Sequence, residues 1–484
     1  MMRISRLLAM TLLLALFAAA CGGAESSSDD TSDADDAAAA DESTDDEGSD
    51  EEAADEGSDD EAMDEGSDDE AMDEGEMAEG DFGGAEVTIT GPERDDPSVA
   101  AIQQTLTQWA EPQGINVTYT GDADWEANIN TQVSGGNPPN ISIFPQPGKL
   151  QEFAADGFVV PLSDEVDATI DEFWAEDFQA DGQLDGTQYG VPVKTDLKSL
   201  VWYQPARFEE FGYEIPDTID DFTALMDQMV EDGNTPLCVG IESGQATGWT
   251  YTDWVEEMML RLHGGEVYDQ WVTHEIPFDD PQVVEAMQAV LDFWVPENVF
   301  ASGGSIAATN FGDNAQPLVD GQCMMHRQAS FFAGFFPEGQ AFADGSEEAV
   351  DVFAFPDING DNPALTAGTY AAAFSEDEAT MAVLNYMATA DYAETRQTIQ
   401  TEELGGSLSG FLSAAQGQDP SVYQPLEQSF LEILNTADLA RFDASDLMPA
   451  DVGAGTFWSE GTSAVNGDIT AEEAAANIEA SWPE

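Results

Sequence analysis

Trp249 and Arg327 are the residues whose types and surroundings best suit the binding of a small polyhydroxylated molecule. Trp249 lies between Gly248 and an expected helix, so we expect its ring in a loop, where it either contacts a ligand or packs. Arg327 ends an expected strand and is one of only 11 Lys and Arg residues. An aromatic ring stacks on apolar C–H faces, and a planar guanidinium can hold two neighbouring hydroxyls. We interpret Arg327 as a hydroxyl clamp, with a structural ion pair as the alternative, and Arg441 has the same two interpretations.

Patterns for catalysis or metal binding are weak by comparison. Paired carboxylates could cleave a glycoside, but among 99 Asp and Glu residues such pairs carry no information. The three histidines form no H-E-x-x-H motif, and the sequence contains no G-x-S-x-G. Cys323 has only His326 nearby as a base that could activate its thiol. The segment Asp357–Asp361 resembles a calcium-binding loop only weakly, because its glycine comes too early and no Glu closes the loop. We therefore expect no enzyme, no metal and no cofactor.

The elements that must position these residues form an α/β pattern from about residue 84 onward. Three expected strands at 86–90, 116–120 and 141–144 alternate with helices at 99–109 and 125–134. This alternation predicts a parallel sheet with crossover helices, and ligands gather at the carboxyl ends of such strands. Further strands are expected at 198–203, 237–241, 323–327, 350–355 and 371–374, and further helices at 205–211, 218–232, 251–262, 281–295, 376–390, 392–401, 422–436 and 471–482. About 400 residues are enough for two cores.

The N-terminal residues have the layout of an export signal. Arg3 and Arg6 precede an apolar run at 7–17, and three alanines at 18–20 precede Cys21. The run is too short to span a bilayer comfortably. Small residues before a cysteine resemble a lipobox, although Ala18 stands where leucine is usual. We predict a signal peptide at 1–20 and a lipidated Cys21 that anchors the protein to the outer face of the membrane, with ordinary cleavage and a free thiol as the alternative.

Residues 21–83 predict a disordered acidic tether behind that anchor. A nine-residue unit, DEGSDDEAM, occurs at 55–63 and again at 64–72, and residues 22–83 contain no basic residue. Such a segment cannot bury enough apolar area to fold, and its like charges extend it. The formal net charge of the whole chain is −88, which excludes nucleic acid and anionic membrane surfaces as partners. The acidity indicates either a salty medium, which we favour, or cationic partners.

Three cysteines are present, and lipidation of Cys21 leaves Cys238 and Cys323 as an even pair. Outside the cell, these two can form a persistent disulfide, with two buried apolar cysteines as the alternative.

Several segments together resemble bacterial extracellular solute-binding proteins, family 1. They are Ser134–Phe144, where Asn140 replaces the usual Asp, Tyr189–Pro192, Val201–Pro205, Val319–Met325 and Glu376–Asp391. Three more segments look most like the α-glucoside-binding subgroup: Gly240–Trp249, His326–Phe331 and Arg441–Pro449. The resemblance implies an α/β, two-lobed periplasmic-binding-protein type II fold with a hinge and an interlobe cleft. By the family's chain path, lobe 1 takes 84–197 and 367–410, and lobe 2 takes 198–366 and 411–484.

The resemblance also places further residues in that cleft. Phe331 and Trp458 stand where the family stacks sugar, although either could belong to the core. Gln146 and Glu242 follow strands at positions that face the cleft in the family fold, and Asp196 and Tyr370 occupy hinge-side positions. With Trp249, Arg327 and Arg441, these residues make up the expected ligand-binding set.

The function that this resemblance implies is capture of a sugar for an ABC importer by hinge closure, with delivery to the permease subunits. The expected partners are a small sugar, the permease and the membrane through the lipid anchor only; we expect no nucleic acid and a monomer. The alternatives are the same role with a compatible solute, polyamine or peptide, and an adhesive surface protein without a hinge. A cationic ligand would predict a cage of carboxylates and aromatic rings rather than an arginine clamp.

Overall fold

The structure is a computed structural model that describes residues 82–358, 360 and 362–483. The predicted signal peptide at 1–20, Cys21 and the tether up to residue 81 lie outside the described residues. Phe82 donates its backbone N–H to Gln113 O at 2.8 Å and packs against a core, so the packed domain includes residues assigned from the sequence to the tether. Among the described helices, none is both long and apolar enough to cross a membrane.

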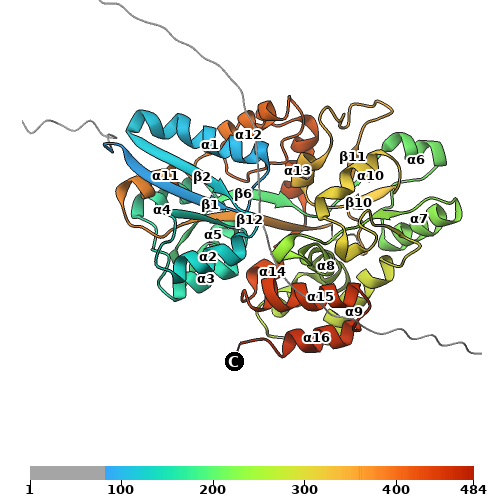
Figure 1. Cartoon of the computed structure of the whole chain (residues 1–484). Helices are drawn as coiled ribbons and strands as arrows, with labels where there is room; N and C mark the ends of the chain where they lie inside the picture. The colour runs from blue at the N-terminus through green and yellow to red at the C-terminus, as the bar shows by residue number, and fades with distance from the viewer. Residues whose placement is uncertain (1–81, 359, 361, 484) are drawn as a thin grey trace, which may run out of the picture. The chain divides into compact units, whose positions relative to one another are not determined.

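The first half of the domain is built on a six-stranded sheet. Its strands are β1 (Ala85–Gly91), β2 (Ile115–Gly121), β3 (Ile141–Phe144), β6 (Gly190–Leu197), β12 (Pro363–Ala373) and β13 (Leu439–Phe442). The order is β13-β12-β3-β1-β2, with β6 also paired to β12. β1 runs parallel to β2 and β3, as predicted from the alternating pattern. The helices of this half are α1 (Asp96–Ala110), α2 (Trp125–Ser134), α3 (Pro147–Ala155), α4 (Asp164–Phe173), α5 (Glu176–Ala180), α11 (Glu378–Met387) and α12 (Ala390–Glu403), and a small hairpin joins β4 (Gln183–Leu184) to β5 (Thr187–Gln188) (Figure 1).

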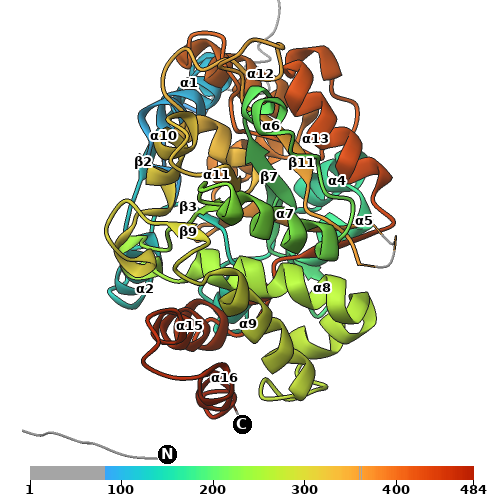
Figure 2. The ribbon, with the colours of Figure 1, turned by 90° about the vertical axis from the view of Figure 1, so that its right-hand side faces the viewer.

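The second half has a five-stranded sheet of its own. Its order is β11 (Asp351–Ala354), β7 (Leu200–Tyr203), β10 (Met325–Arg327), β8 (Leu237–Cys238) and β9 (Val299–Phe300). Figure 2 shows this half from its outer side. Its helices are α6 (Pro205–Phe211), α7 (Ile219–Glu231), α8 (Trp249–Val272), α9 (Pro281–Phe293), α10 (Ala315–Val319), α13 (Pro425–Thr436), α14 (Ala444–Leu447), α15 (Trp458–Val465) and α16 (Ala471–Glu479). Each half has a buried apolar core, which confirms the predicted two-lobed α/β fold.

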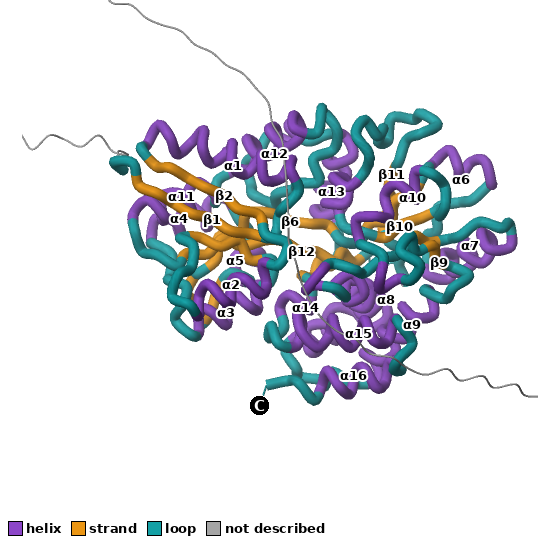
Figure 3. The backbone as a smooth tube through the Cα atoms, in the orientation of Figure 1, coloured by secondary structure: helices purple, strands orange, loops and turns teal. Residues whose placement is uncertain are grey.

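Strands in the middle of the molecule join the two halves. β6 and β12 lie between the two groups of strands in Figure 3. β6 pairs with β12 in the first sheet, and only Lys198 and Ser199 separate it from β7 in the second sheet. Every residue of β12 is buried, which matches a strand covered on both faces. The short Lys198–Ser199 link therefore carries the chain from one lobe to the other.

The predicted disulfide between Cys238 and Cys323 is present in the second lobe. Cys238 ends β8, and Cys323 lies two residues before β10, its neighbour in the sheet. The bridge closes a long stretch of chain, since the two cysteines are 85 residues apart.

Several boundaries differ from those expected from the sequence. The strand expected at 237–241 stops at Cys238, because Gly240 packs directly against the backbone of Thr309 and the chain leaves the ladder. A helix that was not expected from the sequence, α3, begins at Pro147, since proline is well suited to the first turn of a helix. The helix expected at 251–262 begins at Trp249 and runs on to Val272, across a break at Gly264.

Candidate functional site

A cavity of about 490 Å³ lies where the loops of the first sheet meet the helices of the second half. Residues 92–95 follow β1, Asp122 follows β2 and Gln146 follows β3, and all of them line the cavity. This is the carboxyl edge of the parallel strands, where the alternating pattern predicts ligands to gather. On the other side, Trp249 and Asp253 of α8 and Trp458 of α15 complete the lining.

Aromatic rings form one wall of this cavity. The Trp249 ring lies 5.0 Å from the Phe311 ring and 6.0 Å from the Phe331 ring, centre to centre. Phe335 packs 5.2 Å from Phe311 and is partly exposed. Gly248 allows this arrangement, because a Cβ there would lie 2.4 Å from the backbone oxygen of Trp458. The left-handed φ of 116° at Gly248 also turns the chain into α8, so Trp249 stands at the first position of the helix and not in the expected loop.

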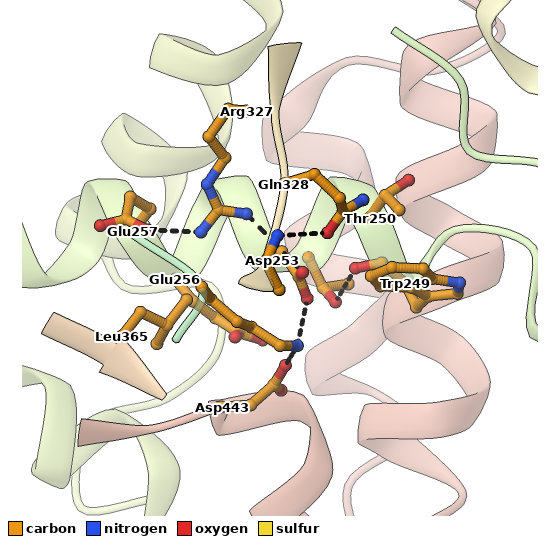
Figure 4. A network of polar contacts seen from close by, with 12 residues as sticks. Trp249, Thr250, Asp253, Glu256, Glu257, Arg327, Gln328, Leu365 and Asp443 are labelled. Atoms are coloured by element: carbon orange, nitrogen blue, oxygen red, sulfur yellow. Dashed lines mark hydrogen bonds and ion pairs between the residues drawn. The ribbon is translucent and has the colours of Figure 1, made fainter. Parts of the chain in front are cut away.

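A buried network of charges lies at the base of the cavity (Figure 4). The Lys198 ammonium is 2.7 Å from Asp253 Oδ1 and also contacts the Asp443 carboxylate. Burial alone would lower the pKa of Lys198, but the Asp253 and Asp443 carboxylates raise it well above its usual value. Burial raises the pKa of Asp253 to about 7, despite the nearby lysine. The lysine in the crossing segment therefore binds acids from α8 and from the start of α14.

Three buried carboxyl groups in this network, Asp253, Glu256 and Asp443, offer oxygens within 4.8 Å of one another. This set could suit a cation by its donor chemistry. The Lys198 ammonium already contacts two of the three, so a side chain supplies the positive charge that a metal ion would bring. Burial raises the pKa of Glu256 well above its usual value, which favours its neutral form.

A second charged cluster also lines the cavity. The Lys194 ammonium is 3.2 Å from Asp196 Oδ2 and 3.6 Å from Glu93 Oε1, and Glu93 also binds Arg396. Burial would raise the pKa of Glu93, but Arg396 and Lys194 together lower it. Burial raises the pKa of Asp196, although Lys194 opposes this effect.

Several buried polar atoms along the lining have no hydrogen-bond partner among the described residues. They are Glu93 Oε2, Gln146 Oε1, Asp196 Oδ1, Thr369 Oγ1 and Trp458 Nε1. A buried polar group without a partner is costly. These atoms have almost no accessible surface, so they could bond a molecule in the cavity only after their side chains turn toward it. Most of them accept hydrogen bonds, and the indole N–H of Trp458 donates one.

Five of the nine residues in the expected ligand-binding set line this cavity together. They are Gln146, Asp196, Trp249, Phe331 and Trp458. They come from both halves of the domain, which places aromatic faces and carboxylate or amide oxygens around one space. Their role in ligand contact remains a prediction.

The other four residues lie outside the cavity lining. Arg327 is buried, contacts the Glu257 carboxylate and lies 3.6 Å from Asp253, which corresponds to the structural ion pair weighed against the clamp. Arg441 binds Asp269 on the surface, with 2.8 Å between Nη2 and Oδ2. Tyr370 is buried and donates its hydroxyl to Phe178 O at 3.0 Å.

Glu242, the fourth, stands just behind the cavity wall. It accepts hydrogen bonds from Asn310 Nδ2 at 2.7 Å and from Gly244 N at 2.8 Å, and these bonds lower its pKa. Asn310 itself lines the cavity, so Glu242 orients a lining residue rather than facing the space directly.

Sequence reasoning missed the two lysines and the acids that bind them. Lys194 and Lys198 could have been singled out by the scarcity of basic residues, which drew attention to the arginines instead. Asp253 and Asp443 carry no such signal, because the chain has 99 acidic residues. Phe311 lies in a short 3₁₀ segment with no recognisable pattern around it.

Comparisons of this sequence with a family profile and with known proteins agree on one family. The profile of the family described as bacterial extracellular solute-binding protein matches residues 96–394. The osmoprotective compounds-binding protein of Synechocystis sp. is 37% identical over 394 residues, 79% of this chain and 89% of that protein. The alpha-glucosides-binding periplasmic protein of Rhizobium meliloti is 36% identical over 424 residues, 83% of this chain and 88% of that protein.

Solved structures agree on the fold. A bacterial solute receptor with a preference for β-D-galactopyranose superposes with a TM-score of 0.68 at 21% identity, covering 82% of this chain and 97% of its own. A chitin oligosaccharide binding protein gives a TM-score of 0.69 at 18% identity, with the same coverage. Sequence, fold and the position of the cavity therefore agree: this chain belongs to the bacterial extracellular solute-binding protein family.

Proposed function

We propose that the chain is the solute-binding component of an ABC importer and that its cavity takes a sugar, an α-glucoside or another small oligosaccharide. The observation that carries the proposal is the pairing of an aromatic wall with unpartnered buried oxygens. The rings of Trp249, Phe331 and Trp458 suit the apolar faces of a sugar, and Gln146 and Asp196 suit its hydroxyls. The two relatives at 36–37% identity, one named for alpha-glucosides, support this solute class.

Capture would work by closure of the two lobes around the solute. We assign 84–197 and 367–410 to lobe 1 and 198–366 and 411–484 to lobe 2, with the Lys198–Ser199 link as part of the hinge. By this assignment β13 and the residues Pro363–Thr366 of β12 with which it pairs belong to lobe 2, although they continue the sheet of the first half. A solute that contacts both lobes stabilises the closed state, because those contacts are incomplete when the lobes are apart. The permease subunits would then recognise the closed form.

Export and anchoring belong to the same proposal. The signal-like residues 1–20 and Cys21 would place a monomer on the outer face of the membrane, with residues 22–81 as its tether. Incorporation of a labelled fatty acid, lost in Cys21→Ser, tests the anchor. An unlabelled wild-type chain would contradict it.

A compatible solute is the second candidate. The observation in its favour is the 37% identity to a relative named for osmoprotective compounds. Some compatible solutes are themselves neutral polyhydroxylated molecules, so the same rings and oxygens would serve them.

A thermal-shift screen in high salt tests the proposal. The panel holds maltose, trehalose, other sugars, glycine betaine and spermidine, each in large excess. A ligand at 100 times its dissociation constant adds about 2.7 kcal/mol to the stability of the folded state, which a melting curve resolves. We expect a rise in Tm with α-glucosides. A rise in Tm only with glycine betaine or spermidine would show that the solute is not a sugar. An unchanged Tm with every compound of the panel would contradict the proposed solute class.

A further inference from the structure

We propose that a π-helical turn, η7 (Val452–Phe457), holds Trp458 in the wall of the cavity, so that residues outside the cavity set the position of this ring. The inference deepens the proposed function and rests on it, because Trp458 is one of the rings assigned to the solute. It follows from the hydrogen bonding of the turn, from the side chains that anchor it, and from two glycines at which backbones meet.

The hydrogen bonding of η7 differs from that of an α-helix. The turn joins α14 to α15, and Trp458 is the first residue of α15. The backbone N–H of Thr456 donates to Asp451 O at 3.0 Å, which is five residues back instead of the four of an α-helix. A π-turn is rare and is frequently found at functional sites. Its extra residue changes the side of the helix that each following residue faces.

Two apolar side chains anchor η7 in the core of the second half. Val452 and Phe457 are both fully buried there, and the Phe457 ring lies 4.9 Å from the Phe278 ring, centre to centre. An α-helix advances about 100° per residue, so two residues five apart would point about 140° away from each other. The π-turn brings both to the same side, towards the core. With Phe457 held in the core, its neighbour Trp458 reaches the cavity wall.

Two glycines fix the backbone on either side of this ring. A Cβ at Gly453, within η7, would lie 1.8 Å from the backbone oxygen of Ser445, which lines the cavity. A Cβ at Gly248 would lie 2.4 Å from the backbone oxygen of Trp458 itself, and Gly248 directly precedes Trp249. A larger residue at either position would force the backbone to move. The segment that carries Trp458 is therefore held by close backbone contacts as well as by its core anchors.

Fluorine NMR of the full-length protein labelled with 5-fluorotryptophan tests the position of the ring without any solute. The chain has 10 tryptophans, and Trp458→Phe identifies the Trp458 resonance by its loss. Gly453→Ala introduces the clash described above, and deletion of Ala454, which is not a core residue, removes the extra residue of the π-turn without a clash. We expect both variants to shift the Trp458 resonance, because each turns or displaces the start of α15.

Gly182→Ala is the matched control. Its Cβ would also meet a backbone oxygen, Gly190 O at 2.5 Å, but in the first half and outside the cavity. It should leave the Trp458 resonance and solute binding unchanged. Melting curves establish that each variant folds.

Calorimetric titration with maltose and with trehalose then links the ring to binding. We expect Gly453→Ala to weaken binding by about 10-fold, the size of one lost ring contact. The double variant with Trp458→Ala should bind no more weakly than Trp458→Ala alone, because the turn acts through this ring.

An unchanged Trp458 resonance in both η7 variants would overturn the inference, and so would losses of affinity that simply add in the double variant. If neither sugar binds the wild-type protein, the proposed sugar function is contradicted, and the resonance alone decides whether η7 positions the ring.

Discussion

Replacing Lys198 with methionine should destabilise the protein strongly, and more at alkaline than at acidic pH. The Lys198 ammonium is the shared partner of Asp253 and Asp443, and all three side chains are buried. Methionine keeps most of the volume and removes the charge. Breaking a buried ion pair by removing one partner costs about 3–5 kcal/mol, because the other charge stays buried without compensation.

The pH dependence follows from the carboxylates that remain. Burial raises the pKa of Asp253 to about 7 even beside Lys198, whereas Lys198 holds the pKa of Asp443 below its usual value. Loss of the ammonium shifts the pKa of each acid upward. An acid whose pKa is raised in the folded state contributes stability at low pH that is lost as pH rises through that pKa. We therefore expect a smaller cost at pH 5 than at pH 8.

Urea unfolding followed by tryptophan fluorescence at both pH values measures this cost. Lys149→Met is the matched control: Lys149 is also buried, burial lowers its pKa, and it has no acidic group within 4.0 Å in the part of the chain that the structure describes. Its replacement should be neutral or stabilising. A cost below about 1 kcal/mol for Lys198→Met at both pH values, or an equal cost at both, would refute the assigned role.

Four further outcomes are expected. Trp249→Ala should weaken sugar binding by about 1–3 kcal/mol, because the stacking surface is lost. Trp109 stacks on Tyr386 outside the cavity, so Trp109→Ala should leave the calorimetric affinity unchanged. Equal affinities of the two variants would contradict the stacking role. Cys238→Ser with Cys323→Ser should cost about 2–5 kcal/mol in urea unfolding, and a reductant should then have no effect on the variant. Burial raises the pKa of Asp181 to about 7, so the stability that its protonated form contributes to the fold is lost as pH rises through 7. Relative to wild type, Asp181→Asn should therefore gain about 1.4 kcal/mol of stability for each pH unit between 5 and 7. Parallel pH profiles of stability would contradict this. The acidic domain should melt lower in about 10 mM than in about 1 M NaCl, and an unchanged Tm would rule out salt adaptation.

The first sheet could be predicted from the sequence because its signals are local. The strand at 86–90 alternates buried and exposed residues, and the helix after it has a cap at Asp95 and a proline in its first turn. The alternation of strands and helices also predicts that Gln146 lies at the carboxyl edge of the parallel strands. Trp249 was identified by its glycine neighbour, whose left-handed φ is a local property as well.

The charged network could not be predicted, because its pairs are distant in sequence. Arg327 binds Glu257, 70 residues away, and Lys198 binds Asp443, 245 residues away. A lone arginine after a strand is equally consistent with a clamp and with an ion pair until its surroundings are known. Among so many acids, nothing in the sequence marks which ones face a lysine.

A crystal structure of the protein with maltose or trehalose at saturating concentration tests the proposed sugar site directly. We expect one sugar inside the cavity, stacked on Trp249 and hydrogen-bonded to Gln146 and Asp196, with both lysines still bound to their own carboxylates. An empty cavity, or a sugar bound only on the outer surface, would contradict it.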